Sequence, residues 1–475
     1  MKKKLIVLGV VLVILSAGCS INKNSNSYEY YENQNLLVNG IESNDFELVK
    51  CAIDNGADLN SLGHNTINTE TNPLFTSLCN SDKKIVLLLL ENGADVNYKS
   101  GRLYDGSNCL MIAAINKYED VCKLLIKEGI DINEKDNEGQ NVIDYAIQAR
   151  SDSYFEEKEI LNLVKMLYKE GVKISNKTKE NILNENESNH ELGKTNVKYE
   201  IIKWLIDIGE IEEIDLGENQ KIFYNVYLEN INYIKKLDDS KLKIKNSSKQ
   251  TLLDVAAKYG KTNIVEYLLN KGFNPKKETV NGFYINSIVY AATSGNLQTL
   301  ETITKNCKLS DKELYRIICS SIYFSTTDEY TDGISYLVDL MSNVNEADGN
   351  ENDNILSEAC SLGLYNTSEL LIDKNVELNG NVLDSAVGSR DISIVKLLID
   401  NGIDVNAIVY YPEDAAEGFE EESSLSDAVF NGDYDIAKLL IENGAVIDKK
   451  SDKNMIEYVD GHISKRMEKL IKDNM

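Results

Sequence analysis

Few residues in this sequence have the types and the spacing that chemistry requires. The 475-residue chain holds three histidines, His64, His190 and His462, and none of them stands in a recognisable motif with a serine or cysteine. The sequence contains no phosphate-binding loop, no G-x-S-x-G, no H-E-x-x-H and no G-x-G-x-x-G. No C-x-x-C pair favours a zinc site, and the run 348–354 lacks the register of a calcium loop. We therefore predict no enzyme activity, no metal site and no cofactor.

The surroundings of Cys19 do indicate a covalent reaction. Lysines occupy positions 2–4, and the apolar run Leu5–Leu15 that follows is short for a membrane-spanning helix. Small residues at 17–18 precede the cysteine. This start resembles a bacterial lipoprotein signal, which implies cleavage before Cys19, acylation of its thiol and a location outside the cytoplasm on a membrane. A plain secretory signal with an incidental cysteine is the alternative. Residues 19–35 are polar, and we expect them to form a flexible tether.

Seven of the eight cysteines remain after Cys19, so they cannot all pair within one chain. Cys51, Cys122 and Cys360 stand at positions where the local pattern expects small apolar residues. We interpret the cysteines as buried thiols rather than as a disulfide framework.

A repeated pattern of apolar residues organises the rest of the chain. The stretch 251–276 reads as two short helices, the second of them ending at Gly272 as a left-handed C-terminal residue. Residues 8, 7, 5, 4 and 3 positions before this glycine are hydrophobic. The same five positions are hydrophobic or cysteine before seven further glycines: Gly56, Gly93, Gly129, Gly171, Gly209, Gly402 and Gly444. Because such a helix pair cannot bury its apolar face alone, the copies must stack on one another.

The pattern resembles the ankyrin repeat, whose opening motif ends in two alanines. The matches are Ala113–Ala114, Ala256–Ala257 and Ala291–Ala292, together with the "NGAD" ends at 55–58 and 92–95. The resemblance implies an all-α solenoid whose first helices and connecting fingers form a concave binding face.

The sequence departs from this family at the position of its conserved histidine. That position holds other residue types here: Phe75, Met111, Asp144, Asp254, Val289, Ser357, Asp384 and Ser426. We expect the hydrogen bonds of the family's histidine to be missing and the fingers to be looser.

We predict roughly twelve units, several of them degenerate. A signal peptide at 1–18 and the tether at 19–35 precede an array over 36–454, and a capping helix covers 455–475. The predicted units span 36–68, 69–105, 106–138, 139–176, 177–217, 218–250, 251–284, 285–310, 311–351, 352–380, 381–420 and 421–454.

Negative charge is concentrated in the connections between helices. The formal net charge is −27, which makes nucleic acid an unfavourable partner. The stretches 207–218 and 408–423 each hold six acidic residues and no lysine or arginine. The second of them also carries aromatic residues, which favour interface cores. Our candidate partner contacts are therefore Tyr410, Tyr411, Phe419, Glu420, Glu421 and Glu422.

The charge also has a plain explanation, because a strongly negative surface keeps copies of an exported array apart. We expect a monomeric, lipid-anchored scaffold of the cell envelope that binds a basic protein surface. A structural spacer of the envelope and an immunity protein that masks an enzyme or toxin are alternatives, and the sequence does not choose among them.

Overall fold

The computed structural model describes the following residues: 26–61, 72–80, 83–101, 106–149, 154–183, 199–276, 285–324, 331–345, 354–410, 421–447 and 465–474. Contacts divide the chain into two compact units. Unit 1 comprises Met1–Ala149 and Glu159–Glu180, and unit 2 comprises Arg150–Lys158 and Asn181–Met475.

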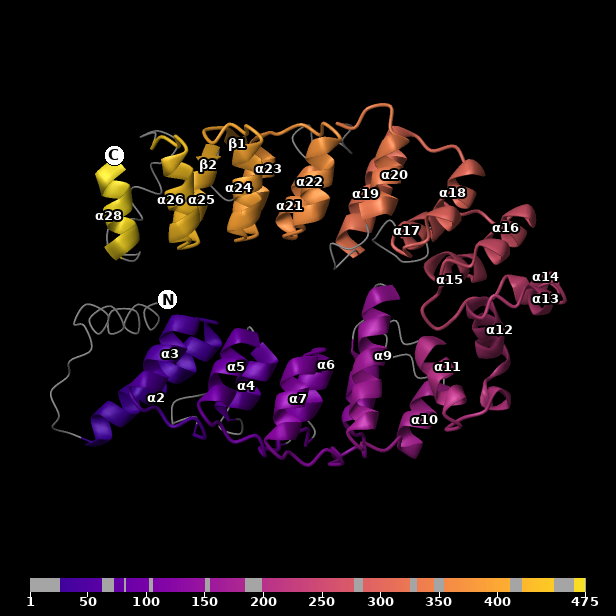
Figure 1. The fold of residues 1–475 in the computed structure, drawn as a ribbon, viewed down its shortest axis with the longest axis horizontal. Coiled ribbons are helices and arrows are strands. Elements are labelled where there is room, and N and C mark those ends of the chain that lie inside the picture. The colour runs from indigo at the N-terminus through magenta and orange to yellow at the C-terminus, as the bar shows by residue number, and fades with distance from the viewer. Residues whose placement is uncertain are drawn as a thin grey trace. The chain divides into compact units, whose positions relative to one another are not determined.

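Unit 1 is built from successive helix pairs (Figure 1). Its helices are α2 (Asn26–Glu42), α3 (Phe46–Asp54), α4 (Pro73–Asn80), α5 (Lys83–Glu91), α6 (Cys109–Ile115), α7 (Glu119–Lys127), α8 (Val142–Gln148), most of α9 (Tyr154–Lys169) and most of α10 (Asn176–Leu183).

Unit 2 continues the same arrangement and adds one two-stranded ribbon. Its elements are α11 (Tyr199–Asp207), the short 3-10 helix η2 (Glu213–Asp215), α12 (Glu218–Tyr227), α13 (Ile231–Ile234), α14 (Asp239–Leu242), α15 (Leu252–Lys258), α16 (Thr262–Asn270), α17 (Ser287–Ala292), α18 (Leu297–Lys305), α19 (Asp311–Phe324), α20 (Thr331–Asp339), α21 (Ile355–Ser361), α22 (Tyr365–Asp373), α23 (Gly380–Gly388), α24 (Ile392–Asp400), β1 (Ile408–Tyr410), β2 (Glu421–Ser423), α25 (Ser424–Phe430), α26 (Tyr434–Glu442) and α28 (Lys465–Asn474).

The packing follows a single rule. A first helix contacts its own second helix and the first helices of the neighbouring pairs, as α15 contacts α16, α12 and α17. Second helices contact one another in the same way, as in α16–α18 and α22–α24. Among the described residues, ten consecutive helix pairs make this contact: α2–α3, α4–α5, α6–α7, α12–α13, α15–α16, α17–α18, α19–α20, α21–α22, α23–α24 and α25–α26. The predicted all-α solenoid of helix pairs is confirmed.

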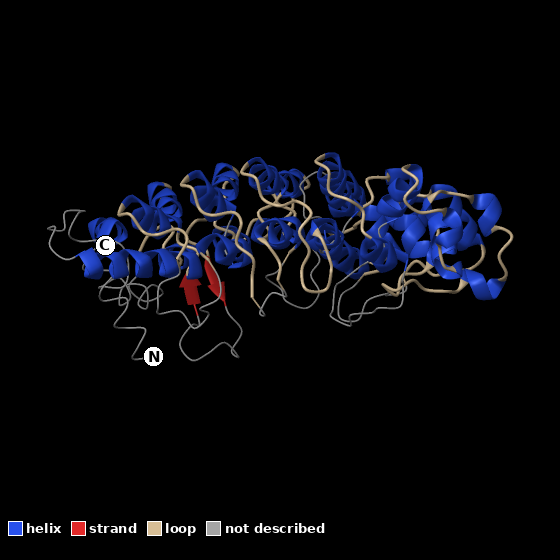
Figure 2. Ribbon diagram, turned by 90° about the horizontal axis from the view of Figure 1, so that it is seen from below, coloured by secondary structure: helices blue, strands red, loops and turns tan. Residues whose placement is uncertain are grey.

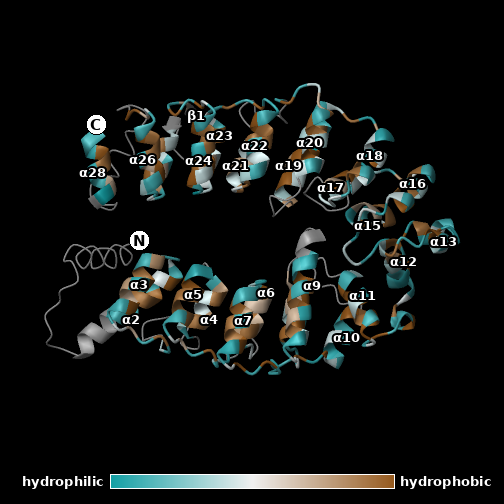
Figure 3. Cartoon of the chain, viewed as in Figure 1, coloured by the Kyte–Doolittle hydropathy of each residue, from teal (hydrophilic) through white to brown (hydrophobic). Residues whose placement is uncertain are grey.

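Burial in α15 and α16 shows why each element has its sequence. Helix α15 has neighbours on three sides, and every residue from Leu252 to Lys258 is buried. Helix α16 contacts α13, α15 and α18 and keeps a stripe open to water, so Ile264, Val265 and Leu268 are buried while Glu266 is exposed. Figure 3 shows hydrophobic and hydrophilic residues alternating along the helices.

Glycines end the second helices as the sequence predicted. All eight glycines used to align the repeats have positive φ, for example 86° at Gly272 and 85° at Gly402. An L-residue with a side chain rarely adopts this conformation, whereas glycine adopts it without steric cost.

Asparagine side chains supply hydrogen bonds in two of these repeats, so the expectation that such bonds are missing is wrong there. The looser fingers stay a prediction. The side chain of Asn354 accepts the N–H groups of Leu356 and Ser357 and donates to the carbonyl oxygen of Glu377 at 2.8 Å. Asn141 likewise caps α8 and donates to the carbonyl oxygen of Lys173 at 2.9 Å. One residue thus begins the first helix and holds the turn that follows the second helix of its own repeat.

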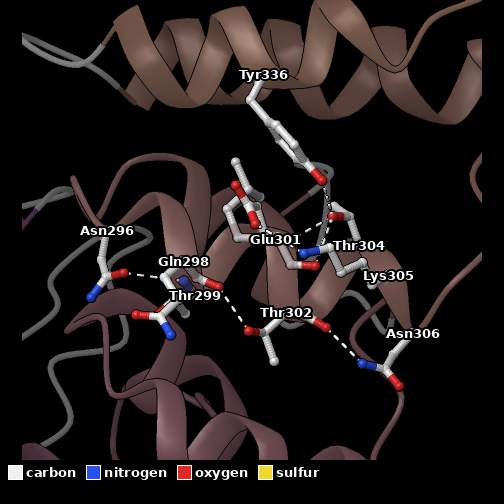
Figure 4. Close-up of polar contacts among 10 residues, drawn as sticks. Asn296, Gln298, Thr299, Glu301, Thr302, Thr304, Lys305, Asn306 and Tyr336 are labelled. Atoms are coloured by element: carbon white, nitrogen blue, oxygen red, sulfur yellow. Dashed lines mark hydrogen bonds and ion pairs between the residues drawn. The ribbon is translucent and has the colours of Figure 1, made fainter.

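Hydroxyl groups join adjacent second helices. Thr299 of α18 lies 2.7 Å from the hydroxyl of Thr262 in α16, and Thr304 lies 2.9 Å from the hydroxyl of Tyr336 in α20. Figure 4 shows Tyr336 reaching across to α18, together with the local polar contacts of that helix. These bonds satisfy polar groups at an interface that is otherwise apolar.

One end of the chain differs from the sequence interpretation. The predicted tether 19–35 is helical from Asn26 onward, because α2 continues into a segment whose Leu37 and Ile41 are buried. At the other end, α28 occupies the last part of the predicted helix 455–475 and contacts α26. It buries Met467 and Ile471.

A close approach of two backbones supplies a stability test. A Cβ atom added at Gly333 of α20 would lie 2.3 Å from the carbonyl oxygen of Ala292 in α17. We expect Gly333→Ala to lower the free energy of unfolding by about 2–3 kcal/mol, because the helices must move apart. In the matched variant Gly388→Ala, the added methyl group meets nothing within 4 Å. It should be neutral or stabilising by up to about 1 kcal/mol. Urea unfolding followed by far-UV circular dichroism measures both, and equal midpoints would contradict the packing described for Gly333.

Candidate functional site

The structure places only part of the predicted contact surface. Cys19, Tyr411, Phe419 and Glu420 lie outside the described residues, as do the side chains of Tyr410, Glu421 and Glu422. The assignments of Cys19 to lipid and of the other six residues to a partner therefore stay predictions.

The backbone at the base of the predicted contact finger is an antiparallel ribbon of β1 and β2. Tyr410 pairs with Glu421, Val409 with Glu422 and Ile408 with Ser423. The ribbon leads directly into α25, whose N-cap is Ser423. Figure 2 shows the two strands standing out from the neighbouring helices. The ribbon thus fixes where the finger leaves and rejoins the array.

The acidic stretch 207–218 is described in full, and it carries an exposed apolar side chain. Ile211 and Leu216 are buried and anchor the turn on unit 2. Between them, Ile214 is 79% exposed, the highest value for a large apolar residue in the described part of the chain. Its neighbours Glu213 and Asp215 are also exposed. An isolated aliphatic residue surrounded by carboxylates at the tip of a turn has no role in the core.

Lysines from neighbouring helices moderate the charge of this acidic stretch. Lys221 of α12 lies 3.8 Å from Glu213, and Lys241 of α14 forms an ion pair with Glu218. Lys203 of α11 pairs with the carboxylate that ends its own helix. Because all these pairs are exposed, they contribute little stability. They do make the turn less negative than its own sequence indicates.

Several finger carboxylates bond their own turn. Asp58, Asp95, Asp131 and Asp404 each accept the N–H group two residues further on at 2.9 Å. The asparagine that closes the first of these turns accepts the N–H of Asp95 in the next finger at 2.8 Å. Acidic residues in the fingers therefore build the turns as well as charge the surface.

Asp311 shows the same use of a carboxylate between repeats. It is the first residue of α19, and it accepts the N–H groups of Ser342 and Asn343 at 3.0 Å each, beyond the end of α20. The Ser342 hydroxyl also donates to it. These hydrogen bonds lower the pKa of Asp311 below its ordinary value, because they favour the charged carboxylate.

This arrangement predicts a stability that depends on pH. Since the pKa of Asp311 is lower in the folded state, its contribution is present above the ordinary carboxyl pKa and is lost as pH falls through the folded value. Asp311→Asn should lower the urea midpoint at neutral pH, and its difference from wild type should shrink below about pH 4. Asp332→Asn, which changes an exposed acid in the first turn of α20, is the control and should show a smaller loss. A loss for Asp311→Asn that is constant from pH 7 to acid would contradict this role.

Residues of α17, α18 and α20 line a small hollow. A hollow of about 110 Å³ beside Ala292, Asn296 and Gly333 is smaller than a typical ligand pocket. Within the described ranges, no three histidine, cysteine, aspartate or glutamate side chains come together as metal ligands. The same part of the chain contains no helix long and apolar enough to cross a bilayer.

Comparison with known proteins agrees with the helix pairs. A family model of ankyrin repeats in many copies matches residues 87–146, and a model of the single ankyrin repeat matches 248–279. A putative ankyrin repeat protein of Rickettsia felis is 29% identical over 211 residues, which cover 42% of this chain and 46% of that protein. The chain thus matches about half the length of this relative.

A second relative is a putative ankyrin repeat protein of Borreliella burgdorferi. It is 29% identical over 175 residues, which cover 33% of this chain and 71% of that protein. Both relatives are bacterial, and the family models fall on the helix pairs α6–α7 and α15–α16. Ankyrin repeats therefore lie at 87–146 and 248–279, and the described helix pairs form an all-α ankyrin-repeat solenoid.

Proposed function

We propose that this chain is an exported protein-binding scaffold, held at a bacterial membrane by lipid on Cys19, whose concave face and acidic fingers contact a basic protein surface. Ankyrin repeats serve protein–protein interaction, and this chain carries them. The observation that supports the acidic-finger contact is the exposed Ile214 between the exposed acids Glu213 and Asp215. An apolar anchor with a charged rim is the usual anatomy of an interface.

The charge distribution favours a basic partner. Acidic turns attract a positive surface over distances of about one Debye length, which raises the rate of association. The aliphatic tip of Ile214 would then be buried at contact, and its desolvation would stabilise the complex. Rigid turns support this role, because little conformational entropy is lost when a partner binds.

The contact is tested by photo-crosslinking in intact cells, followed by recovery of the partner with purified protein. Crosslinks should form from a photoreactive residue at position 214 and not from one at Ile392, an isoleucine that is 44% exposed on the second helix α24. Ile214→Ala should weaken binding about tenfold, the effect of a moderate anchor residue, while Ile392→Ala leaves it unchanged. Equal loss in both variants would contradict a finger contact.

The predicted finger 408–423 is tested in the same assay. Neutralising Glu420, Glu421 and Glu422 to glutamine should reduce the rate of association at low salt, because long-range attraction is weakened. The effect should fade as salt is raised. Unchanged recovery and unchanged rates at low salt would refute a role for this finger.

Lipid attachment is tested by metabolic labelling with a radioactive fatty acid. Cys19→Ser should lose the label and leave the membrane fraction, because the thiol is the proposed acylation site. Cys307→Ser is the matched control and should keep both properties, since its Sγ makes only a local contact with the carbonyl oxygen of Ile303 at 3.4 Å. Label retained by Cys19→Ser would exclude this anchor.

A further inference from the structure

The Glu157 carboxylate in unit 2 is bound by two side chains from another repeat, Lys258 and Tyr259. The side chain of Glu157, near the start of α9, is 0% exposed, and the Lys258 side chain opposite it is 5% exposed. The Lys258 Nζ atom lies 2.7 Å from Oε1 of Glu157, and the Tyr259 hydroxyl donates to Oε2. Contacts assign both partners to unit 2.

Aromatic rings complete this environment. The Tyr259 ring meets Tyr227 and Tyr199 edge to face, with centroids 5.1 Å and 5.8 Å apart. Lys261 lies 5.2 Å from the centre of the Tyr227 ring. Burial and the negative Glu157 raise the pKa of Tyr259 well above its ordinary value, so its phenol keeps the proton that it donates. A cation, a hydroxyl donor and aromatic walls are the groups that recognise a carboxylate.

The position of this site is unusual for a structural ion pair. Lys258 ends the first helix α15, and Tyr259 is its C-cap. In ankyrin repeats, first helices form the face that partners contact. Glu157 lies 101 residues before Lys258 in the chain, on helix α9. This helix has 16 residues, whereas the second helices α7, α16 and α24 have nine residues each. The additional turns of α9 bring the Glu157 carboxylate to the C-terminal end of α15.

The two sides of the contact differ in how firmly the backbone holds them. Glu157 is the fourth residue of α9, and the first four N–H groups of a helix have no partner within it. Unwinding the first turn therefore breaks the hydrogen bonds that amides 158–161 donate to its carbonyl oxygens, but none donated by the turn's own N–H groups. Lys258, by contrast, belongs to a helix whose N-cap Thr251 and Asp254 form a capping box and whose residues are all buried. Glu157 can therefore withdraw while α15, which carries Lys258, stays folded.

We propose that Lys258, Tyr259 and the adjoining tyrosines form a carboxylate-binding site that Glu157 fills as an internal ligand. An acidic side chain of a protein partner takes its place when the first turn of α9 withdraws. That the occupant comes from a protein partner rests on the proposed scaffold function, not on the basic surface proposed for the acidic turns, whereas the carboxylate site itself rests on neither.

The energetics of buried charges agree with a binding role. Removing two charges from water is costly, and apolar residues of similar volume generally stabilise a fold as well or better. The buried ion pair therefore adds little to the stability of the core. Its effect is chemical selectivity: the buried ammonium group of Lys258 requires a negative partner, and a carboxylate meets that requirement.

Chemical rescue tests the site without a partner. Glu157→Ala leaves a cavity beside an unpaired Lys258, so the melting temperature should fall by about 5 °C or more. Acetate at about 0.1 M should raise the melting temperature of this variant by about 2 °C relative to chloride at equal ionic strength, because it binds only the folded state. Acetamide, which has the same shape without the charge, should have no such effect.

The double variant Glu157→Gln/Lys258→Met is the matched control. It replaces the pair by uncharged side chains of similar volume, so it should melt near wild type and show no specific response to acetate. An acetate effect of equal size in Glu157→Ala, wild type and the double variant would be a general salt effect and would overturn the proposal. The absence of any effect in Glu157→Ala would overturn it as well.

Hydrogen exchange of the wild-type chain tests the release and needs no variant. Amides 158–161, whose hydrogen bonds depend on the first turn of α9, should exchange at least about tenfold faster than those of α15. Equal protection of the two segments would mean that Glu157 leaves Lys258 only when the protein unfolds. That result would contradict the proposed replacement of Glu157 by a partner's carboxylate. A failure of the partner assays with successful acetate rescue would instead refute the scaffold function and leave the carboxylate site standing.

Discussion

The structure depends on apolar faces that no repeat can bury by itself. Helix α15 is buried along its whole length only because α12, α16 and α17 surround it, and the same holds for α17 with its own neighbours. A helix of seven residues is too short to be stable alone in water, so its folding is tied to the adjacent pairs. Stability in such an array is a sum of interfaces between neighbours, which lets the turns vary in length and charge.

This constraint explains what the sequence could and could not predict. The spacing of apolar residues before Gly272 and the other aligned glycines predicted the second helices and their left-handed ends, because both signals are local. The asparagine bonds could not be found by matching the family motif, since Asn354 and Asn141 supply them from the N-cap rather than from the histidine position. The helical start of α2 was missed because its first residues are polar, and its buried residues begin only further along the helix.

The candidate site was predictable only in part, for a related reason. The acidic stretch 207–218 is plain in the sequence, but the exposure of Ile214 between the buried Ile211 and Leu216 follows from the fold. The lysines that pair with Glu213 and Glu218 come from α12 and α14, so counting charges within the stretch overstates its potential. The contact of Glu157 with Lys258 joins positions 101 residues apart, and no local pattern indicates it.

Carboxylates in this chain therefore serve different purposes according to what surrounds them. Asp95 and Asp311 are partly exposed and bond backbone N–H groups, so they fix turns and links between repeats at little desolvation cost. The acids beside Ile214 face water and contribute a long-range field. Glu157 is fully buried, where a charge persists only with a cation and donors in place. Lys258 supplies that cation, and the lengthened α9 carries Glu157 to it, so the two groups meet within one chain at a high effective concentration.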